Sequence, residues 1–218
     1  MPTDVIIVGA GGFGRETLDV IEAHNEAGRD PVHVIGVADD NPNEINLQRL
    51  EARGYRHLGP IGDVVRSCSC RRFIIAVGDP FAREKIRQEF FDDSWVPLTV
   101  IHPASTIGSL SQIANGCVVC SGVQVSTNVV IGPHTHLNPN ATIGHDTVIE
   151  AFVSINPGSI ISGEVHIGRL VLIGAGAVVL QGLTLAGATV IGAGAVLVRD
   201  VQSSATYVGV PARRLHLS

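Results

Sequence analysis

Residues 173–197 read IGAGAVVLQGLTLAGATVIGAGAVL, and an aliphatic residue returns at every sixth position of this stretch. A helix cannot use a period of six, because successive positions would rotate around its axis. Four residues after each aliphatic residue stands an uncharged residue, which is small in most cases. The period holds without a break for sixteen aliphatic positions, which are Ile107, Ile113, Val119, Val125, Ile131, Leu137, Ile143, Ile149, Ile155, Ile161, Ile167, Ile173, Val179, Leu185, Ile191 and Leu197.

A strand alternates its faces every two residues, so two inward residues followed by a turn rich in Gly and Asn predict a short strand and a corner. Three such units, eighteen positions in all, close one triangular coil of a hexapeptide parallel β-helix. Neighbouring coils stack at about 4.8 Å, the spacing of adjacent strands. We therefore predict a β-helix over residues 101–218, in which residues one full coil apart lie directly above one another.

The first 100 residues follow a different pattern, in which apolar runs alternate with helical stretches. We expect strands at 4–8, 32–38, 73–77 and 98–101, and helices at 15–27, 44–53 and 81–91. This alternation is typical of a Rossmann-like α/β domain with a parallel sheet, which we assign to residues 1–100. The fold class is thus α/β plus β, and Trp95–Pro103 joins the two predicted domains.

The motif Gly9-Ala-Gly-Gly-Phe-Gly14 lies between the first predicted strand and the first predicted helix. Its glycines let the backbone approach a phosphate, and the helix N-terminus offers free N–H groups and a positive dipole end. Asp39 ends the next strand, where a carboxylate can hold a ribose hydroxyl. Taken alone, the motif suggests NAD. Nothing in a β-helix, however, needs a hydride donor.

Composition excludes several other classes of protein. The net charge of -5, from 15 basic and 20 acidic residues, argues against nucleic acid as the main partner. No apolar run approaches the ~18 residues of a membrane helix, and the N-terminus lacks the basic segment of a signal peptide. Four Cys in 218 residues do not make a disulfide framework, so we expect a cytoplasmic protein.

A family resemblance adds to these patterns. The two units that read IGAGAV, at 173–178 and 191–196, and the ending YVGVPAR at 207–213 resemble the hexapeptide-repeat acyltransferases. Nearly the whole chain resembles the NeuD/PglD-like sugar acetyltransferases, and the segments that carry this likeness are 8–14, 39–40, 75–78, 101–103, 144–146 and 161–163.

The resemblance implies a left-handed β-helix that binds acetyl-CoA and a homotrimer with active sites between subunits. It also implies an N-terminal domain that holds a nucleotide-linked sugar rather than NAD. Some members of the family acetylate a 4-amino group of such a sugar, and others are sialic acid O-acetyltransferases. The residues expected to bind the nucleotide-linked sugar are Gly9, Gly11, Gly12, Phe13, Gly14, Asp39, Asp40 and Gly78.

His145 and Asp146 are the expected catalytic pair, because the family's His-Asp/Glu pair falls on these positions. His145 stands two residues after Ile143, at a corner of the predicted coil, and an imidazole suits a general base near neutral pH. Gly163 follows one full coil later, so we predict it directly above His145. There its N–H would bind the carbonyl oxygen of the thioester.

Acetyl-CoA is expected at another corner, where Gly174-Ala-Gly176 and Gly192-Ala-Gly194 stack one coil apart. We assign Gly163, Gly174, Ala175, Gly192 and Ala193 to this cosubstrate, and Arg213 to its phosphates.

The chain departs from the family at Ser154, where many members carry a second His. His136, one coil below Ser154, is a candidate replacement, although we expect it to be exposed to solvent or to lie at a trimer interface.

A zinc site is a rival interpretation, because γ-class carbonic anhydrases share the β-helix and bind metal between subunits. Zinc needs three convergent ligands, whereas we expect His134 at a different corner from His145, and His136 and His166 pointing outward from flat strands. The cysteine pairs at 68 and 70 and at 117 and 120 are likewise not expected to converge. We predict no metal.

The sequence therefore predicts an acetyl-CoA-dependent N-acetyltransferase that acts on a nucleotide-linked amino sugar by direct transfer in a ternary complex. Three alternatives stay open. They are an O-acetyltransferase acting on sialic acid or another sugar hydroxyl, a non-catalytic trimeric scaffold that binds a nucleotide, and an NAD-linked protein.

Overall fold

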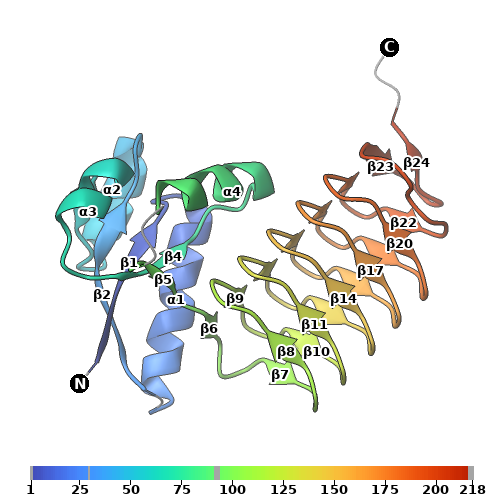
Figure 1. Cartoon of the computed structure of the whole chain (residues 1–218), viewed down its shortest axis with the longest axis horizontal. Helices are drawn as coiled ribbons and strands as arrows, with labels where there is room; N and C mark the ends of the chain where they lie inside the picture. Colours follow the sequence, from blue (N-terminus) through green and yellow to red (C-terminus); the bar gives the residue numbers. More distant parts are fainter. Residues whose placement is uncertain (1, 29, 91–93, 216–218) are drawn as a thin grey trace. The chain divides into compact units, whose positions relative to one another are not determined.

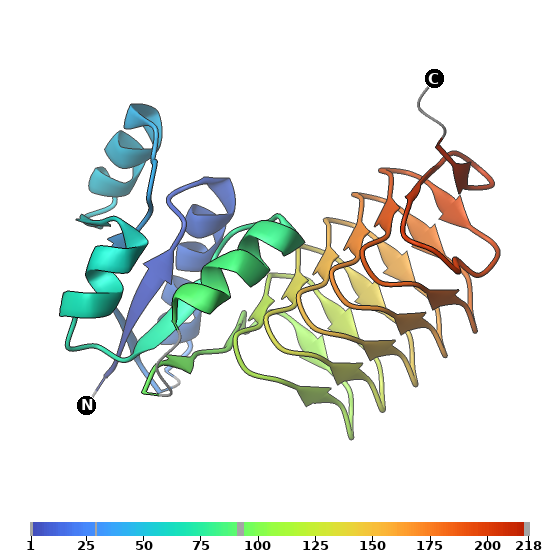
Figure 2. The same cartoon turned by 45° about the horizontal axis from the view of Figure 1, so that its top comes forward.

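A computed structural model describes residues 2–28, 30–90 and 94–215 of the chain (Figure 1). The chain divides into two compact units, Met1–Pro103 and Ala104–Ser218. Figure 2 shows the first as helices around a sheet and the second as a stack of coils. In the described ranges, no helix combines the length and the apolar character needed to cross a membrane.

The first unit is built on a parallel sheet with the strand order β3-β2-β1-β4-β5. From β1 the chain first builds outward through β2 to β3 and then returns to the other side of β1 for β4 and β5. The glycine motif therefore follows the strand at which the order reverses, which is where ligands bind in open α/β sheets. The strands are β1 (Thr3–Val8), β2 (Val32–Ala38), β3 (His57–Gly59), β4 (Arg72–Ile75) and β5 (Val96–Pro97), and the helices are α1 (Gly12–Glu26), α2 (Glu44–Glu51), α3 (Ile61–Ser67) and α4 (Pro80–Glu89).

Three aromatic side chains form part of the core on one side of this sheet. Phe73 of β4 stacks on Phe90 with 4.0 Å between the ring centroids, and Trp95 meets both rings edge-on. All three are buried. Trp95 thereby anchors the segment that leads into β5.

The predicted strands at 4–8, 32–38 and 73–77 correspond to β1, β2 and β4. The predicted strand at 98–101 is wrong, because the last strand of this sheet is β5 at Val96–Pro97, and Val100–Ile101 form β6, a short strand at the end of the 8-stranded sheet. A proline lacks the N–H that an inner strand needs but fits an edge strand, which is the place of β5.

Two elements of the first unit, β3 and α3, were not predicted, since at 3 and 7 residues they are too short to show a period. Helix α1 begins at Gly12, inside the glycine motif, rather than at residue 15. Helix α4 ends at Glu89, and residue 91 of the predicted helix lies outside the described residues.

The second unit confirms the β-helix. Its strands lie in three flat walls, each with parallel strands one coil apart, so that Thr142 pairs with Ile160 and Ile143 with Ile161. Wall 1 holds β7 (Thr106–Ile107), β10 (Gln124–Val125), β13 (Thr142–Ile143), β16 (Ile160–Ile161), β19 (Val178–Val179) and β22 (Val196–Leu197). Wall 2 holds β8 (Gln112–Ile113), β11 (Val130–Ile131), β14 (Val148–Ile149), β17 (His166–Ile167) and β20 (Thr184–Leu185).

Wall 3 holds β9 (Val118–Val119), β12 (His136–Leu137), β15 (Ser154–Ile155), β18 (Leu172–Ile173), β21 (Val190–Ile191), β23 (Thr206–Val208) and β24 (Arg213–Arg214), of which only β24 runs antiparallel to its neighbour. The repeated aliphatic residues point inward, and those from Val119 to Leu197 are buried. The second inward positions include hydroxyls that bond the next coil, as Thr147 does to the carbonyl of Ser162.

Each corner of the β-helix turns through a residue in the left-handed backbone conformation. We call the corner between walls 1 and 2 corner A, that between walls 2 and 3 corner B, and that between walls 3 and 1 corner C. In corner A the left-handed residues are Leu110, Asn128, Asp146, Glu164 and Gly182. Gly, Asn and Asp adopt this conformation most readily, which explains the turn composition of the repeat.

Candidate active site

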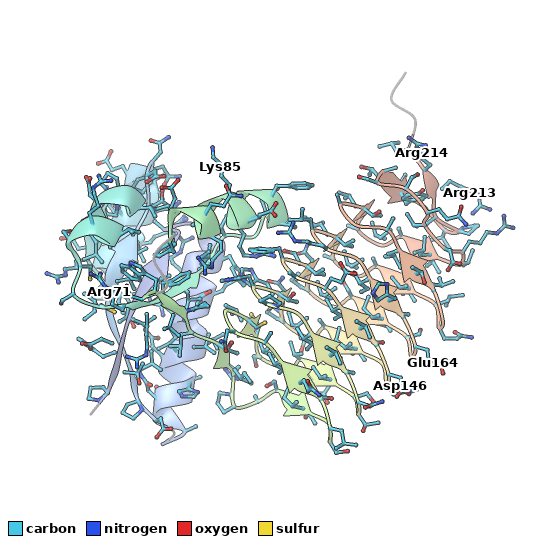
Figure 3. All side chains as sticks on the ribbon, in the orientation of Figure 1. Arg71, Lys85, Asp146, Glu164, Arg213 and Arg214 are labelled. Atoms are coloured by element: carbon cyan, nitrogen blue, oxygen red, sulfur yellow. The ribbon has the colours of Figure 1, made fainter. Side chains whose placement is uncertain are left out.

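His145 lies in corner A, two residues after the end of β13 and next to Asp146, which Figure 3 labels. The preceding Gly144 permits the tight stacking of this turn, because a Cβ there would lie 2.4 Å from the backbone nitrogen of Gly163. The side chain of His145 keeps 57% of its surface exposed, and that of the neighbouring Asp146 keeps 44%. The ring is therefore fixed at its base and open to a ligand.

Asp146 orients the imidazole. Its Oδ2 lies 2.7 Å from Nδ1 of His145, and its Oδ1 accepts a hydrogen bond of 2.6 Å from Nδ2 of Asn128. These hydrogen bonds, that from Asn128 first, lower the pKa of the Asp146 carboxyl below its ordinary value. Because the ionised carboxylate can only accept, Nδ1 of His145 donates the proton, and Nε2 then carries the lone pair.

Gly163 lies directly against the imidazole, as the stacking of coils predicts. A Cβ on Gly163 would lie 2.6 Å from both Cε1 and Nε2 of His145, so any side chain at this position would displace the imidazole. Among the described residues, the N–H of Gly163 donates to no backbone acceptor, whereas the next N–H, of Glu164, bonds to the carbonyl of His145 at 2.8 Å. A free backbone donor and a free imidazole nitrogen thus stand side by side.

The structure stacks the two Gly-Ala-Gly turns at corner C. The N–H of Gly194 bonds to the carbonyl of Ala175 at 2.8 Å, and a Cβ on Gly174 would lie 2.4 Å from the backbone nitrogen of Ala193. Ala175 and Ala193 are exposed. Arg213 lies near the last coil and is exposed, with its Nη1 on the carbonyl of Ala212 (Figure 3).

The glycine motif of the first unit contains two kinds of glycine. Gly9 and Gly14 are required by packing, since a Cβ on Gly14 would lie 2.0 Å from the carbonyl oxygen of Gly9. A Cβ on Gly11 or Gly12 would meet nothing within 4 Å. Gly11 is the N-cap of α1 and supplies no side chain that caps the first turn of the helix.

The two aspartates after β2 are engaged within the chain. Asp39 accepts the N–H of Ala10 at 2.7 Å and that of Asn41 at 2.9 Å, so it ties the glycine motif to the next loop. Asp40 accepts the N–H of Ile61 at 2.8 Å, at the start of α3. Both carboxylates therefore shape the loop around the motif, a role that the sequence did not indicate.

Gly78 lies in the loop between β4 and α4, where a Cβ would meet nothing within 4 Å. Arg83 of α4 is fully buried and donates from Nη1 to the carbonyls of Val77 and Gly78. This arginine fixes the loop after β4, at the same edge of the sheet as the glycine motif.

The remaining histidines of the β-helix do not join His145. His134 is in corner B, buried and stacked on Phe152 at 5.0 Å. The expectation that His136 is exposed is wrong, because it and the paired Ser154 are buried. His166 lies on wall 2 and His136 on wall 3, so the two rings belong to different faces. Within the described residues, no three His, Cys, Asp or Glu side chains gather as a metal site.

Two family models match the chain, one in each of its two units. Residues 4–90 match the model of the PglD N-terminal domain, and residues 146–181 match that of the bacterial transferase hexapeptide repeats. The chain is thus similar to the NeuD/PglD-like sugar acetyltransferases, through the PglD N-terminal domain over most of its first unit and through hexapeptide repeats over part of its second.

Individual relatives carry more specific names. A GDP-perosamine N-acetyltransferase of Escherichia coli O157:H7 is 29% identical over 150 residues, which are 68% of this chain and 65% of that relative. A mutant of perosamine N-acetyltransferase from Caulobacter crescentus, solved in complex with CoA and GDP-perosamine, matches with a TM-score of 0.83 at 27% identity over 98% of this chain and 97% of that one. The acetyltransferase domain of PglB from Neisseria gonorrhoeae, solved in complex with acetyl coenzyme A, has a TM-score of 0.87 at 28% identity over 99% of this chain and 100% of that domain.

Proposed function

We propose that this acetyltransferase moves an acetyl group from acetyl-CoA to the amino group of a nucleotide-linked sugar. One observation carries the proposal, namely the contact at corner A between an imidazole oriented by Asp146 and the side-chain-free Gly163. Such a site offers a base and an oxyanion donor within one coil. The names of the relatives support an amine as acceptor and a nucleotide-linked sugar as its carrier.

In the proposed mechanism, Nε2 of His145 accepts a proton as the amine nitrogen adds to the carbonyl carbon of the thioester. The Gly163 N–H donates to the oxyanion of the tetrahedral intermediate. The Asp146 carboxylate stabilises the imidazolium that forms. When the intermediate collapses, the carbon–sulfur bond breaks, and the CoA thiolate takes the proton from His145. No covalent enzyme intermediate is needed, which agrees with direct transfer in a ternary complex.

The nucleotide is assigned to the first unit. The N-terminus of α1, which has no side-chain cap, suits a diphosphate, and Gly11 and Gly12 leave the space for it to approach. Asp39 and Asp40 keep lone pairs for the ribose or base after accepting their backbone bonds, and Gly78 borders the same loop edge. Acetyl-CoA is assigned to the Gly-Ala-Gly turns of corner C, with Arg213 on its phosphates.

The base assignment is tested with His145→Ala. Loss of the general base should lower kcat by about 100-fold or more, while the Kd for acetyl-CoA stays nearly unchanged. The assay follows release of the CoA thiol with GDP-, UDP-, dTDP- and CMP-linked sugars, including amino and hydroxyl acceptors. His166→Ala is the matched control, because His166 is also an imidazole of the β-helix, half-buried, with a carboxylate partner, Glu150 at 3.3 Å.

Two results would remove parts of the proposal. Retained turnover in His145→Ala would remove the base, and turnover only with hydroxyl acceptors would replace the amine by an alcohol.

We further propose a homotrimer as the working assembly. Multi-angle light scattering should give three times the chain mass of 22.9 kDa, and a monomeric active enzyme would contradict it.

A further inference from the structure

Corner A holds one more polar side chain that neither sequence motif nor family model singles out. Asn128 occupies the same corner position as Asp146, one coil below it. Its Nδ2 donates to Oδ1 of Asp146 at 2.6 Å, while Oδ2 of the same carboxylate faces Nδ1 of His145 at 2.7 Å. The carboxylate is thus held between an amide and an imidazole.

We propose that Asn128 is a positioning residue that fixes the Asp146 carboxylate, and through it the ring of His145, for the transfer reaction. This inference rests on the proposed function of His145 as the base. Asn128, Asp146, His145 and Gly163 then form one chain of contacts that climbs three successive coils of corner A.

The backbone makes Asn128 a firm anchor. Asn128 has φ 62° and Asp146 has φ 58°, so both side chains leave the backbone from the same left-handed position. The N–H of Asn128 bonds to the carbonyl of Ser109 at 2.9 Å, and the N–H of Asp146 bonds to that of Thr127 at 3.2 Å. Each turn is therefore fixed to the coil below. The backbone thus already holds the Asn128 amide and the Asp146 carboxylate in positions where they can form a hydrogen bond.

The charges at this corner are few. The titratable groups on the described coils beside His145 are Asp146 and, one coil above it, Glu164, which Figure 3 shows at the same corner. Thr127 and Asn128 lie one coil below and do not titrate. A second hydrogen bond to Asp146 that brings no charge can therefore hold the carboxylate without weakening its attraction for the imidazolium.

The test compares Asn128→Gly with Asn128→Asp. Glycine keeps the left-handed turn and removes the amide, and Asp keeps shape and turn but replaces the donor by a carboxylate. Loss of one charge-assisted hydrogen bond should lower kcat about tenfold in Asn128→Gly, with KM for both substrates within about twofold. Asn128→Asp should be impaired at least as much at neutral pH, and the acid limb of its kcat profile should move to higher pH, because the added negative charge favours the imidazolium.

The matched control is Asn140→Gly. Asn140 has φ 61° and an N–H bonded to the carbonyl of Ser121, but it belongs to corner C and does not touch Asp146. Its kcat should remain within about twofold of the unmodified enzyme. A merely structural role for Asn128 predicts instead that Asn128→Gly and Asn128→Asp both retain full activity, because both preserve the turn, and that result would overturn the proposal.

A second measurement does not depend on activity. Nitrogen-15 shifts of the His145 ring, assigned by their loss in His145→Gln, report which ring nitrogen carries the proton. The unmodified protein should show the Nδ1-protonated form, and Asn128→Gly should show a mixture. Unchanged shifts in Asn128→Gly would overturn the positioning role. Changed shifts with unchanged turnover would support the positioning role but remove His145 as the base, so the two proposals fail separately.

Discussion

At the scale of single residues, the site depends on backbone conformation as much as on side-chain chemistry. Asp146 reaches His145 because it occupies the left-handed position of its corner, where Asp is tolerated and most larger residues are strained. The pair is adjacent in sequence, so no long-range folding event is needed to bring the carboxylate to the ring. What the stack of coils adds is Gly163 above and Asn128 below.

Gly163→Ala tests the contact above the ring. The new Cβ would lie 2.6 Å from Nε2, so the imidazole must turn away, and we expect kcat to fall about 100-fold. Gly163 has no left-handed φ, so alanine suits its backbone, and circular dichroism should show an unchanged melting temperature. Full activity in this variant would show that the ring does not work where the structure places it.

Asp146→Asn tests the carboxylate through its pH dependence. Because the pKa of Asp146 is lowered, the carboxylate is ionised and its contribution is present at neutral pH. That contribution is lost only as the pH falls through the lowered pKa, which lies below the ordinary value of an aspartyl carboxyl.

In Asp146→Asn, we expect kcat to fall at least about tenfold and the acid limb to move to lower pH, since the imidazolium loses its counter-charge. Steady-state rates across about pH 5–9, the range in which an imidazole titrates, measure both effects. An acid limb that stays in place would show that Asp146 does not act on His145.

At the scale of elements, the glycines around the start of α1 have two different roles, since some are needed for packing and others leave space for a ligand. Gly14→Ala would push a Cβ to 2.0 Å from the carbonyl oxygen of Gly9, and we expect a loss of about 2 kcal/mol or more in stability. Gly11→Ala and Gly12→Ala meet nothing, so these variants should melt like the unmodified protein and bind the nucleotide-linked sugar more weakly. Thermal melts with and without ligand check both statements, and equal effects of all three substitutions would contradict them.

Much of this architecture is predictable from sequence because its pattern is long. Sixteen repeats of six fix the register of the β-helix, and with it the approach of Gly163 to His145. The edge strand β5 contains Pro97, and a proline is not expected in a strand, so the sequence pattern does not reveal this element. The elements β3 and α3 are too short to show a pattern.

The site is predictable only in part. The place of Asn128 follows from the arithmetic of the coil, because it stands one coil before Asp146, but nothing in the sequence says that its amide points upward. The backbone bonds of Asp39 and Asp40 and the burial of Arg83 and His136 depend on three-dimensional packing that no short period encodes.

At the scale of the whole molecule, the number of residues between two positions of the β-helix determines whether they stack above one another. Deleting one six-residue unit, Val148–Val153, keeps the hexapeptide pattern but places Arg169 instead of Gly163 directly above His145. We expect a β-rich circular dichroism spectrum and no detectable turnover. Turnover in this deletion would show that vertical stacking does not build the site.

In the proposed binding mode, with acetyl-CoA at the Gly-Ala-Gly turns of corner C, the parallel stacking of coils also links the site to the length of the cosubstrate. The imidazole and the Gly192 turn are separated by fewer than three coils, each about 4.8 Å high, so the interval between them changes only in steps of that height. A flexible arm that carries an acetyl group must match one of these steps. Evolution can therefore exchange acyl donors of different reach by adding or removing whole coils between the two corners, without altering any side chain that performs the chemistry.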